Sequence, residues 1–395
     1  MIQVLGDLPK KVERIEWCEM TPSQKRLYND ALRRSRKTVM DLTEEPSDSG
    51  ETKPTKKAPK KGKGNGRKEK QYVENSANVL MDLRKAASHP MLFRSLFTDE
   101  AVTSIARVLL KEPDFKSRGA VLQYVREDLE VMTDSELQVY MATYRVCRID
   151  HRHPGRPNAG FQSTQKFLQD PECYFRAGKV KTLLKLLKGY MTEKRRVLIF
   201  SQVRPFSPLS RFWSDAPPPS QFTQVLDILQ AILKNRKIKY LLLTGSTAVD
   251  LRQSLVDEFN EDDSITVFLL STKAGGMGIN LTSASVVVMF DQDFNPHNDR
   301  QAQDRAYRIG QKRDVDVVKL ITRGTVEEDM LRLGQMKLDL DEAVAGDGDE
   351  QDTKVENEMK KSLMKTLRQK FEEESKADGS GPEALGSPLT DMEVD

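Results

Sequence analysis

From Lys179 onward, the chain alternates short runs of Val, Ile and Leu with segments of helical periodicity. The runs are long enough for buried strands, and they lack the apolar–polar alternation of a half-exposed sheet. Such runs, separated by helices, are typical of a parallel sheet that is covered on both faces. The sequence therefore predicts an α/β domain with helices on both faces of a parallel sheet. The strands are expected at VLIFS (197–201), KYLLLT (239–244), ITVFLLS (265–271), SVVVMFD (285–291) and VDVVKLI (315–321).

The rest of the chain divides by composition. We expect a helical connector (1–43), a basic Pro/Gly/Lys linker (44–71), a helical region (72–175), the α/β lobe (176–345) and an acidic, largely disordered tail (346–395). The tail holds one amphipathic stretch, which either binds a partner or packs back on the core. Its apolar residues are spaced by four: Val355, Met359, Leu363, Leu367 and Phe371.

The formal net charge of +3 conceals two blocks of opposite charge. Residues 51–70 carry nine Lys and Arg against two Glu, and residues 346–395 carry fourteen Asp and Glu against seven Lys and Arg. Such blocks are typical of solvated segments that serve as interaction tails. The basic run 52–70 fits a nuclear-localisation signal, a DNA-backbone contact or a plain solvated linker.

The cysteines and histidines predict neither a disulfide framework nor a metal site. Cys18, Cys147 and Cys173 lie far apart without a CxxC pair, and His151 and His153 have no further ligand at metal-binding spacing. The chain has no amino-terminal run of the signal-peptide kind and no apolar stretch of membrane-spanning length. We therefore expect an intracellular protein of a reducing compartment, with no membrane partner.

Residues 203–221 interrupt the strand–helix pattern. They separate the strand VLIFS from its helix, where a connection of about 2–6 residues is usual. Without them the sequence reads VLIFSQFTQVLDIL, a continuous strand–turn–helix. The segment begins with Val-Arg, which a GT dinucleotide can help to encode, and ends with Pro-Pro-Pro-Ser-Gln, which a pyrimidine tract closing in CAG can encode. We interpret it as an unspliced intron; the alternative is a surface loop with an exposed aromatic cluster.

The segment QAQDRAYRIGQ (301–311) carries two arginines three residues apart. On one continuous helix, Gln301, Arg305 and Arg308 would share a face, at spacings i, i+4 and i+7. Two guanidinium groups on a polar helix suit a phosphate group. The alternative is a solvated surface on which Asp304 pairs with Arg308.

Two predicted strands end in small polar residues. Thr244-Gly245-Ser246 follows one of them, and its hydroxyls suit a phosphate oxygen of DNA. The loop STKAGGMG (271–278) follows another, and its three glycines allow backbone N–H groups to approach a ligand closely. Each segment is also compatible with a tight turn that binds nothing.

These blocks occur in one order: VLIFSQ, LTGST, LLSTKAGGMGINL, VVVMFDQDFNPHNDRQAQDRAYRIGQ and VDVVKLITRGTVEE. Together they resemble the second motor lobe of the Swi/Snf family of DNA-translocating ATPases, within helicase superfamily two. DQDFNPHNDRQA and LRKAASHPMLF most resemble the Fun-thirty branch of chromatin remodellers. The resemblance is strong over 180–345 and moderate over 8–100.

The resemblance implies a RecA-like lobe that supplies arginine fingers to ATP, with Mg²⁺ held by a first lobe. It assigns Arg305 and Arg308 the catalytic role. It places Gln301, Gly276 and Gly278 at the nucleotide. It also implies double-stranded DNA and nucleosomes as partners, the first RecA-like lobe as the other half of the motor, and a nuclear location. The implied DNA contacts are Ser271, Thr272, Lys273, Thr244, Gly245 and Ser246.

The chain contains no GxxxxGK[ST] phosphate loop and no DExH-type box after a strand. We therefore expect the carboxyl-terminal half of a motor, which does not hydrolyse ATP by itself. The competing hypothesis is a non-catalytic DNA- or chromatin-binding module that keeps the lobe fold. A Rossmann-type cofactor enzyme is poorly supported, because no GxGxxG follows the first predicted strand of the lobe.

Overall fold

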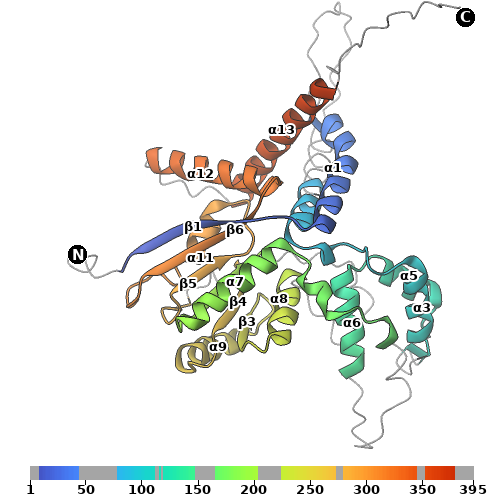
Figure 1. Cartoon of the computed structure of the whole chain (residues 1–395), viewed down its shortest axis with the longest axis horizontal. Coiled ribbons are helices and arrows are strands. Elements are labelled where there is room, and N and C mark those ends of the chain that lie inside the picture. The colour runs from blue at the N-terminus through green and yellow to red at the C-terminus, as the bar shows by residue number, and fades with distance from the viewer. Residues whose placement is uncertain are drawn as a thin grey trace, which may run out of the picture.

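The computed structural model describes eight stretches of the chain, and its centre is one parallel sheet (Figure 1). The strands run in the order β1-β6-β5-β2-β4-β3, and every neighbouring pair is parallel. The strands are β1 (Lys11–Cys18), β2 (Val197–Ser201), β3 (Tyr240–Leu243), β4 (Val267–Ser271), β5 (Val286–Met289) and β6 (Val315–Thr322). The described residues are 9–43, 78–111, 115–116, 119–146, 165–202, 224–272, 279–344 and 352–378.

Alternate side chains of the central strands enter two separate hydrophobic cores. In β2, Val197 and Ile199 pack in one core with α7 (Gly178–Thr192) and α8 (Gln224–Asn235). Leu198 and Phe200 pack in the other core, with α9 (Val249–Glu261) and α11 (Pro296–Gln303). Because both faces are covered, every residue of β2, β4 and β5 is buried. The predicted α/β architecture is confirmed.

The amino-terminal segment differs from the expected helical connector. Lys11–Cys18 forms the edge strand β1 beside β6, and helix α1 (Pro22–Thr43) follows it. Five of the eight β1 residues are exposed and one is buried, so charged residues dilute the apolar pattern that reveals the inner strands. Cross-strand pairing helps to hold β1 in place, since Lys319 Nζ lies 3.2 Å from Glu13 Oε2. The helical prediction was wrong for this strand.

A third core joins helices from both ends of the chain. Helix α1, a helix over 78–88, α12 (Val326–Val344) and α13 (Asp352–Asp378) pack together, and α1 and α13 project side by side from the sheet (Figure 1). Leu363 and Leu367 of α13 are buried here, and Arg36 donates to the carbonyl of Phe371 at 3.4 Å. The amphipathic stretch of the tail therefore packs back on the chain.

A small helical unit forms the fourth core. It consists of α3 (Asp99–Leu109), α5 (Leu122–Glu130) and α6 (Asp134–Val146). Short 3₁₀ turns flank it at η2 (Pro90–Leu92), η4 (Gln165–Phe167) and η5 (Pro171–Phe175). Asp134 accepts hydrogen bonds from the backbone of Ser95, Leu96 and Phe97, and Glu136 accepts one from Gln224 of α8 at 2.9 Å. The bonds to Asp134 hold the unit together, and the bond between Gln224 and Glu136 joins it to the lobe.

Several features predicted from sequence lie outside the described residues. They are the linker 44–71, the segment 203–221, the loop 273–278, Cys147, and the pair His151 and His153. The described cysteines, Cys18 and Cys173, are buried free thiols. Among the described helices, none is long and apolar enough to cross a membrane.

Gly178 marks the closest approach between the amino-terminal segment and the lobe. A Cβ atom at this position would lie 1.9 Å from the carbonyl oxygen of Glu19, and the Gly178 N–H donates to Gln24 at 2.8 Å. We expect Gly178→Ala to lower the free energy of unfolding by roughly 2–3 kcal/mol through overpacking. Gly189→Ala, on the same helix with open space around it, is the control and should stabilise by roughly 0.5–1 kcal/mol. Equal urea midpoints for the two variants would contradict the close contact.

Candidate functional site

The residues predicted to bind ligands lie at opposite ends of the parallel strands. We call the side on which the strands end the carboxyl edge of the sheet, and the side on which they begin the amino edge. Thr244 follows the carboxyl end of β3, and Ser271 ends the neighbouring strand β4. Arg305 lies at the other edge, because its carbonyl accepts the N–H of Leu281, which precedes β5. Asp304 is beside the first residue of β1, with Lys11 Nζ 3.8 Å from its carboxylate. The structure thus places the predicted DNA-contacting residues at the carboxyl edge and the arginine segment at the amino edge, on opposite sides of the sheet.

At the carboxyl edge, most of the predicted DNA-contacting side chains are turned inward. Thr244, Ser271 and Thr272 are buried, whereas Gly245 and Ser246 are exposed. The Thr244 and Ser246 hydroxyls lie 2.8 Å apart. Arg252 of α9 holds the turn by donating to the carbonyls of Gly245 and Thr247. Gly245 and Ser246 are therefore the described members of this set that an external phosphate can reach.

At the amino edge, the arginine segment is a turn and not one helix. Helix α11 ends at Gln303, and residues 304–306 form turns whose N–H groups reach the carbonyls of Arg300, Ala302 and Gln303. The expectation that Gln301, Arg305 and Arg308 share one helical face was wrong. Gln301 is exposed on α11 itself. Gly310, with φ +103°, completes the turn.

The two arginines nevertheless remain close in space. Burial lowers the pKa of Arg305, and the positive charge of Arg308 lowers it further. Arg305 is half-buried and Arg308 is exposed. Two neighbouring cations, one of them partly desolvated, raise the local positive potential and favour a bound anion.

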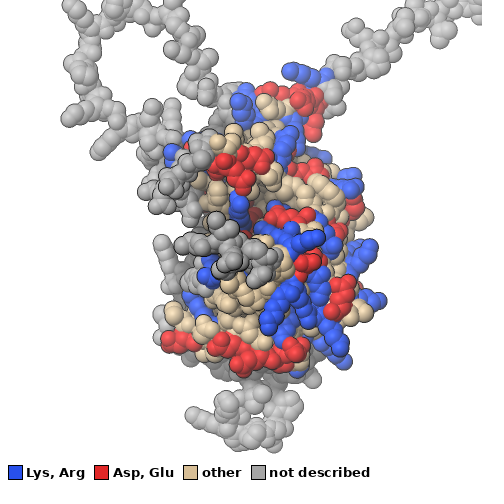
Figure 2. Space-filling model, turned by 90° about the vertical axis from the view of Figure 1, so that its left-hand side faces the viewer, with Lys and Arg blue, Asp and Glu red and all other residues tan. Residues whose placement is uncertain are grey.

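More exposed cations lie at the amino edge. Figure 2 views the molecule from the side on which β1 begins, and it shows Lys and Arg side chains gathered on one part of that face. Lys194, Lys312 and Arg313 are exposed at the amino edge, and Arg313 donates to the Lys194 carbonyl at 3.4 Å. This surface suits a polyanionic ligand.

Gln311 holds the arginine turn in place, a role that the sequence did not indicate. Its buried side-chain amide donates to the carbonyls of Ala284, at 2.8 Å, and Ala306, at 3.0 Å. Its oxygen accepts the N–H groups of Lys312 and Arg313. One side chain thus ties both ends of the turn to the segment before β5. The final glutamine of RIGQ was the available signal.

We expect Gln311→Ala to impair positioning of the arginines. If the arginines act on ATP, as the family resemblance implies, kcat for ATP in a protein with both lobes should fall by at least about tenfold while KM stays unchanged, because a small misplacement of a reacting group lowers the rate steeply. Gln335→Ala is the control, since the Gln335 side chain is exposed and bonds Asp339 on the same helix. A loss of thermal stability with kcat retained would show that Gln311 is merely structural.

A buried polar network at the carboxyl edge also escaped sequence reasoning. Lys179 Nζ lies 2.6 Å from Glu327 Oε1 and donates to the Phe290 carbonyl at 2.7 Å. The other oxygen of Glu327 accepts the N–H of Thr322, at the end of β6. Nearby, the guanidinium of Arg84 lies 4.6 Å from the centre of the Phe294 ring and donates to the Gln292 carbonyl. The network locks α7, α12 and the strand ends together.

Asp291 belongs to this network. Its carboxylate accepts hydrogen bonds from the Ser201 hydroxyl and the Gln202 N–H, each at 2.6 Å, so it joins the ends of β5 and β2. Burial raises the pKa of Asp291, and the charge of Arg84 partly offsets that shift. Among the described residues, no cluster of three or more His, Cys, Asp or Glu has the arrangement of a metal site.

The lobe belongs to a class of domains, the carboxyl-terminal domain of helicases. The sequence model of one protein family, the helicase conserved C-terminal domain, matches residues 178–310. A crystal structure of the C-terminal part of the Fun30 ATPase domain superposes with a TM-score of 0.69 at 32% identity. That match covers 93% of this chain and 99% of the other. The chain therefore belongs to the Fun30 family of SNF2-type ATPases and corresponds to their C-terminal ATPase lobe.

Curated relatives carry the same resemblance over almost the whole chain. The ATP-dependent helicase fft2 of Schizosaccharomyces pombe is 35% identical over 98% of the chain, and FUN30 of Saccharomyces cerevisiae is 36% identical over 96%. The human SWI/SNF-related matrix-associated actin-dependent regulator of chromatin subfamily A containing DEAD/H box 1 is 37% identical over 88%. The chain spans only 25% to 29% of the length of these relatives.

Proposed function

We propose that this chain is the second motor lobe of an ATP-dependent DNA translocase that remodels chromatin. In this proposal, Arg305 and Arg308 act as arginine fingers on ATP held by a first lobe. The observation that carries it is the arginine turn, which Gln311 and Leu281 fix to the lobe with Arg308 exposed. Arginine fingers neutralise charge that develops during phosphoryl transfer. The ATP-dependent helicases among the relatives support the assignment.

The residues at the amino edge fit a nucleotide phosphate but not a complete nucleotide site. Arg308 and Gln301 are exposed beside the half-buried Arg305, so positive charge is available to a γ-phosphate. The described part has no carboxylate cluster for Mg²⁺, which the proposal assigns to the first lobe together with the phosphate loop. Gly276 and Gly278, proposed near the nucleotide, lie outside the described residues.

We further propose that the carboxyl edge contacts the backbone of double-stranded DNA, in nucleosomes within the nucleus. Gly245 and Ser246 offer an exposed backbone and hydroxyl there, while the buried Thr244, Ser271 and Thr272 shape the strand ends. Lys273, the cationic member of the set, lies outside the described residues. Contacts of this kind hold phosphates without reading bases.

DNA binding by the chain tests this part of the proposal. The chain should bind duplexes of unrelated sequence with equal affinity, and binding should weaken steeply as salt rises. Ser246→Glu should weaken binding about tenfold by placing a negative charge at the phosphate contact. Asp257→Asn, on the exposed surface of α9, is the control. If Ser246→Glu and the unaltered chain bound duplex DNA with equal affinity, the Thr244–Ser246 turn would not be part of the DNA-binding surface.

A further inference from the structure

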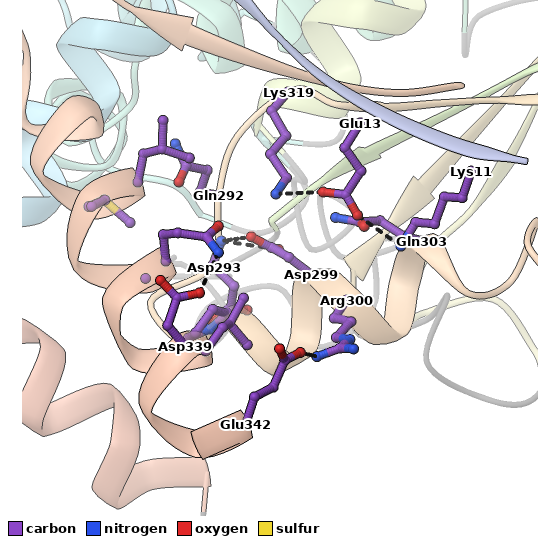
Figure 3. Close-up of a pocket in the computed structure, with 16 residues that line it drawn as sticks. Lys11, Glu13, Gln292, Asp293, Asp299, Arg300, Gln303, Lys319, Asp339 and Glu342 are labelled. Carbon is purple, nitrogen blue, oxygen red and sulfur yellow. Dashed lines mark hydrogen bonds and ion pairs between the residues drawn. The ribbon is translucent and has the colours of Figure 1, made fainter. Parts of the chain in front are cut away.

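A pocket of about 320 Å³ lies between strands β1 and β6 on one side and helices α11 and α12 on the other (Figure 3). Glu13 and Lys319 come from β1 and β6, and Asp299 and Gln303 come from α11. Helix α12 closes the opposite side with Asp339 and other residues. No residue of the arginine turn or of the carboxyl-edge turn lines it.

The lining combines acidic groups with an apolar strip. Its five carboxylates outnumber its three cations, Lys11, Arg300 and Lys319. All three cations are already paired, because Arg300 contacts Glu342 at 2.8 Å, and Lys11 and Lys319 contact Glu13 at 2.9 and 3.2 Å. The apolar strip comes from α12 and the start of α11. The carboxylates are Glu13, Asp293, Asp299, Asp339 and Glu342, and the apolar residues are Pro296, Met330, Leu331 and Leu338.

Two polar side chains inside the pocket keep unused hydrogen-bonding capacity toward the described residues. Gln303 is only 3% exposed, yet its side-chain amide makes no hydrogen bond to any residue in the described part of the chain. Asp299 is 9% exposed, and among the described residues both of its oxygens accept the backbone N–H of Asp293, at 3.0 and 3.2 Å. The amide of Gln303 faces the pocket with its bonding capacity unused by the described residues, so it can bond a ligand that enters.

The surroundings of Asp299 favour its protonated form. Burial raises the pKa of Asp299 to about 8, and the negative charge of Asp293 adds to the shift. An arriving cation would favour the ionised carboxylate and bring the pKa down. The titratable groups that surround Asp299 are Asp291 and Asp293 before α11, Arg300 on α11, Lys11 and Glu13 on β1, Lys319 on β6, and Asp339 and Glu342 on α12.

We propose that this pocket binds an arginine side chain from a partner protein. The alkyl stem would pack along Leu331 and Leu338, and the guanidinium would donate to the oxygens of Asp299 and Gln303. A planar guanidinium offers several donors at fixed angles and is weakly hydrated, which suits two buried acceptors on one helix better than an ammonium does. The occupant would rest on α11 directly before the arginine turn, a contact independent of the ATPase and DNA proposals.

Short peptides test the proposal on the 395-residue chain. Acetyl-Gly-Arg-Gly-amide should bind in an NMR titration, and the same peptide with neutral citrulline should bind at least about tenfold more weakly. Because Asp299 must lose its proton, affinity for the arginine peptide should rise with pH, by up to about tenfold per unit below pH 8, and level off above it. Equal binding of both peptides, or a preference for free spermidine over the arginine peptide, would overturn the proposal.

Two variants test whether the arginine peptide binds in this pocket. Asp299→Asn resembles the protonated carboxyl, so the fold should persist while binding and its pH dependence are lost. Gln303→Met removes the buried amide at similar volume and should weaken binding about tenfold. Asp250→Asn, an exposed carboxylate on α9, is the matched control and should bind like the unaltered chain. Undiminished peptide binding by both pocket variants, with unchanged melting temperatures, would exclude the pocket.

Discussion

Alanine at Arg305 or Arg308 is expected to lower ATP turnover by roughly 10³–10⁵-fold in a protein that carries both motor lobes, the range known for arginine fingers. Affinity for ATP should change little, because the guanidinium groups act mainly on charge that develops in the transition state. Steady-state kinetics together with nucleotide-binding measurements would separate the two effects.

Arg300→Ala provides the matched control for these variants. Arg300 lies on α11, is exposed, and pairs with Glu342 at 2.8 Å. It is close in sequence to the arginine turn but is fixed on the helix that precedes it. Turnover by Arg300→Ala should stay near normal. Near-normal turnover by Arg305→Ala or Arg308→Ala would instead show that the finger assignment is wrong.

The largest effect on stability is expected at the buried ion pair between Lys179 and Glu327. Both side chains are almost inaccessible, at 0% and 3% exposure. Lys179→Met would leave Glu327 charged without its partner, so we expect a loss of about 3–5 kcal/mol in the free energy of unfolding. Urea unfolding of the chain, followed by circular dichroism, measures this change.

Two further variants test whether the loss of stability comes from the uncompensated charge and from its burial. Lys179→Met combined with Glu327→Leu should recover part of the loss, because no uncompensated charge remains. Arg126→Met removes the exposed pair with Glu130, also at 2.6 Å, and should change stability by less than about 1 kcal/mol. Similar losses for Lys179→Met and Arg126→Met would mean that burial does not control the energy of the pair.

The inner strands could be predicted because local sequence determines them. β2, β4 and β5 are buried on both faces, so all of their residues are apolar or small, and the resulting continuous apolar run can be recognised in the sequence. β1 could not be predicted in this way. Its exposed edge position allows charged residues, and its pairing partner β6 lies about 300 residues away in the sequence. Pairing over such a distance leaves no local pattern.

The candidate site was predictable in its residue types but not in its geometry. Arg305 and Arg308 do lie together, but on a turn, because Gln311 binds the Ala306 carbonyl and Gly310 adopts a positive φ. Nor does a strand-end motif tell which hydroxyls face inward, as Ser271 and Thr272 do. The Lys179 network and the Asp299 pocket join segments that are distant in the chain, so they emerge only from the folded structure.

ATP hydrolysis by separated and joined lobes tests the central claim most directly. The 395-residue chain, the first lobe of a Fun30-family relative, and the two joined in one polypeptide would be assayed with and without duplex DNA. We predict background hydrolysis by each lobe alone, and DNA-stimulated hydrolysis by the joined protein that is lost with Arg308→Ala. Hydrolysis above background by the 395-residue chain alone, or a joined protein indifferent to Arg308→Ala, would contradict the assignment of this chain as the arginine-finger lobe.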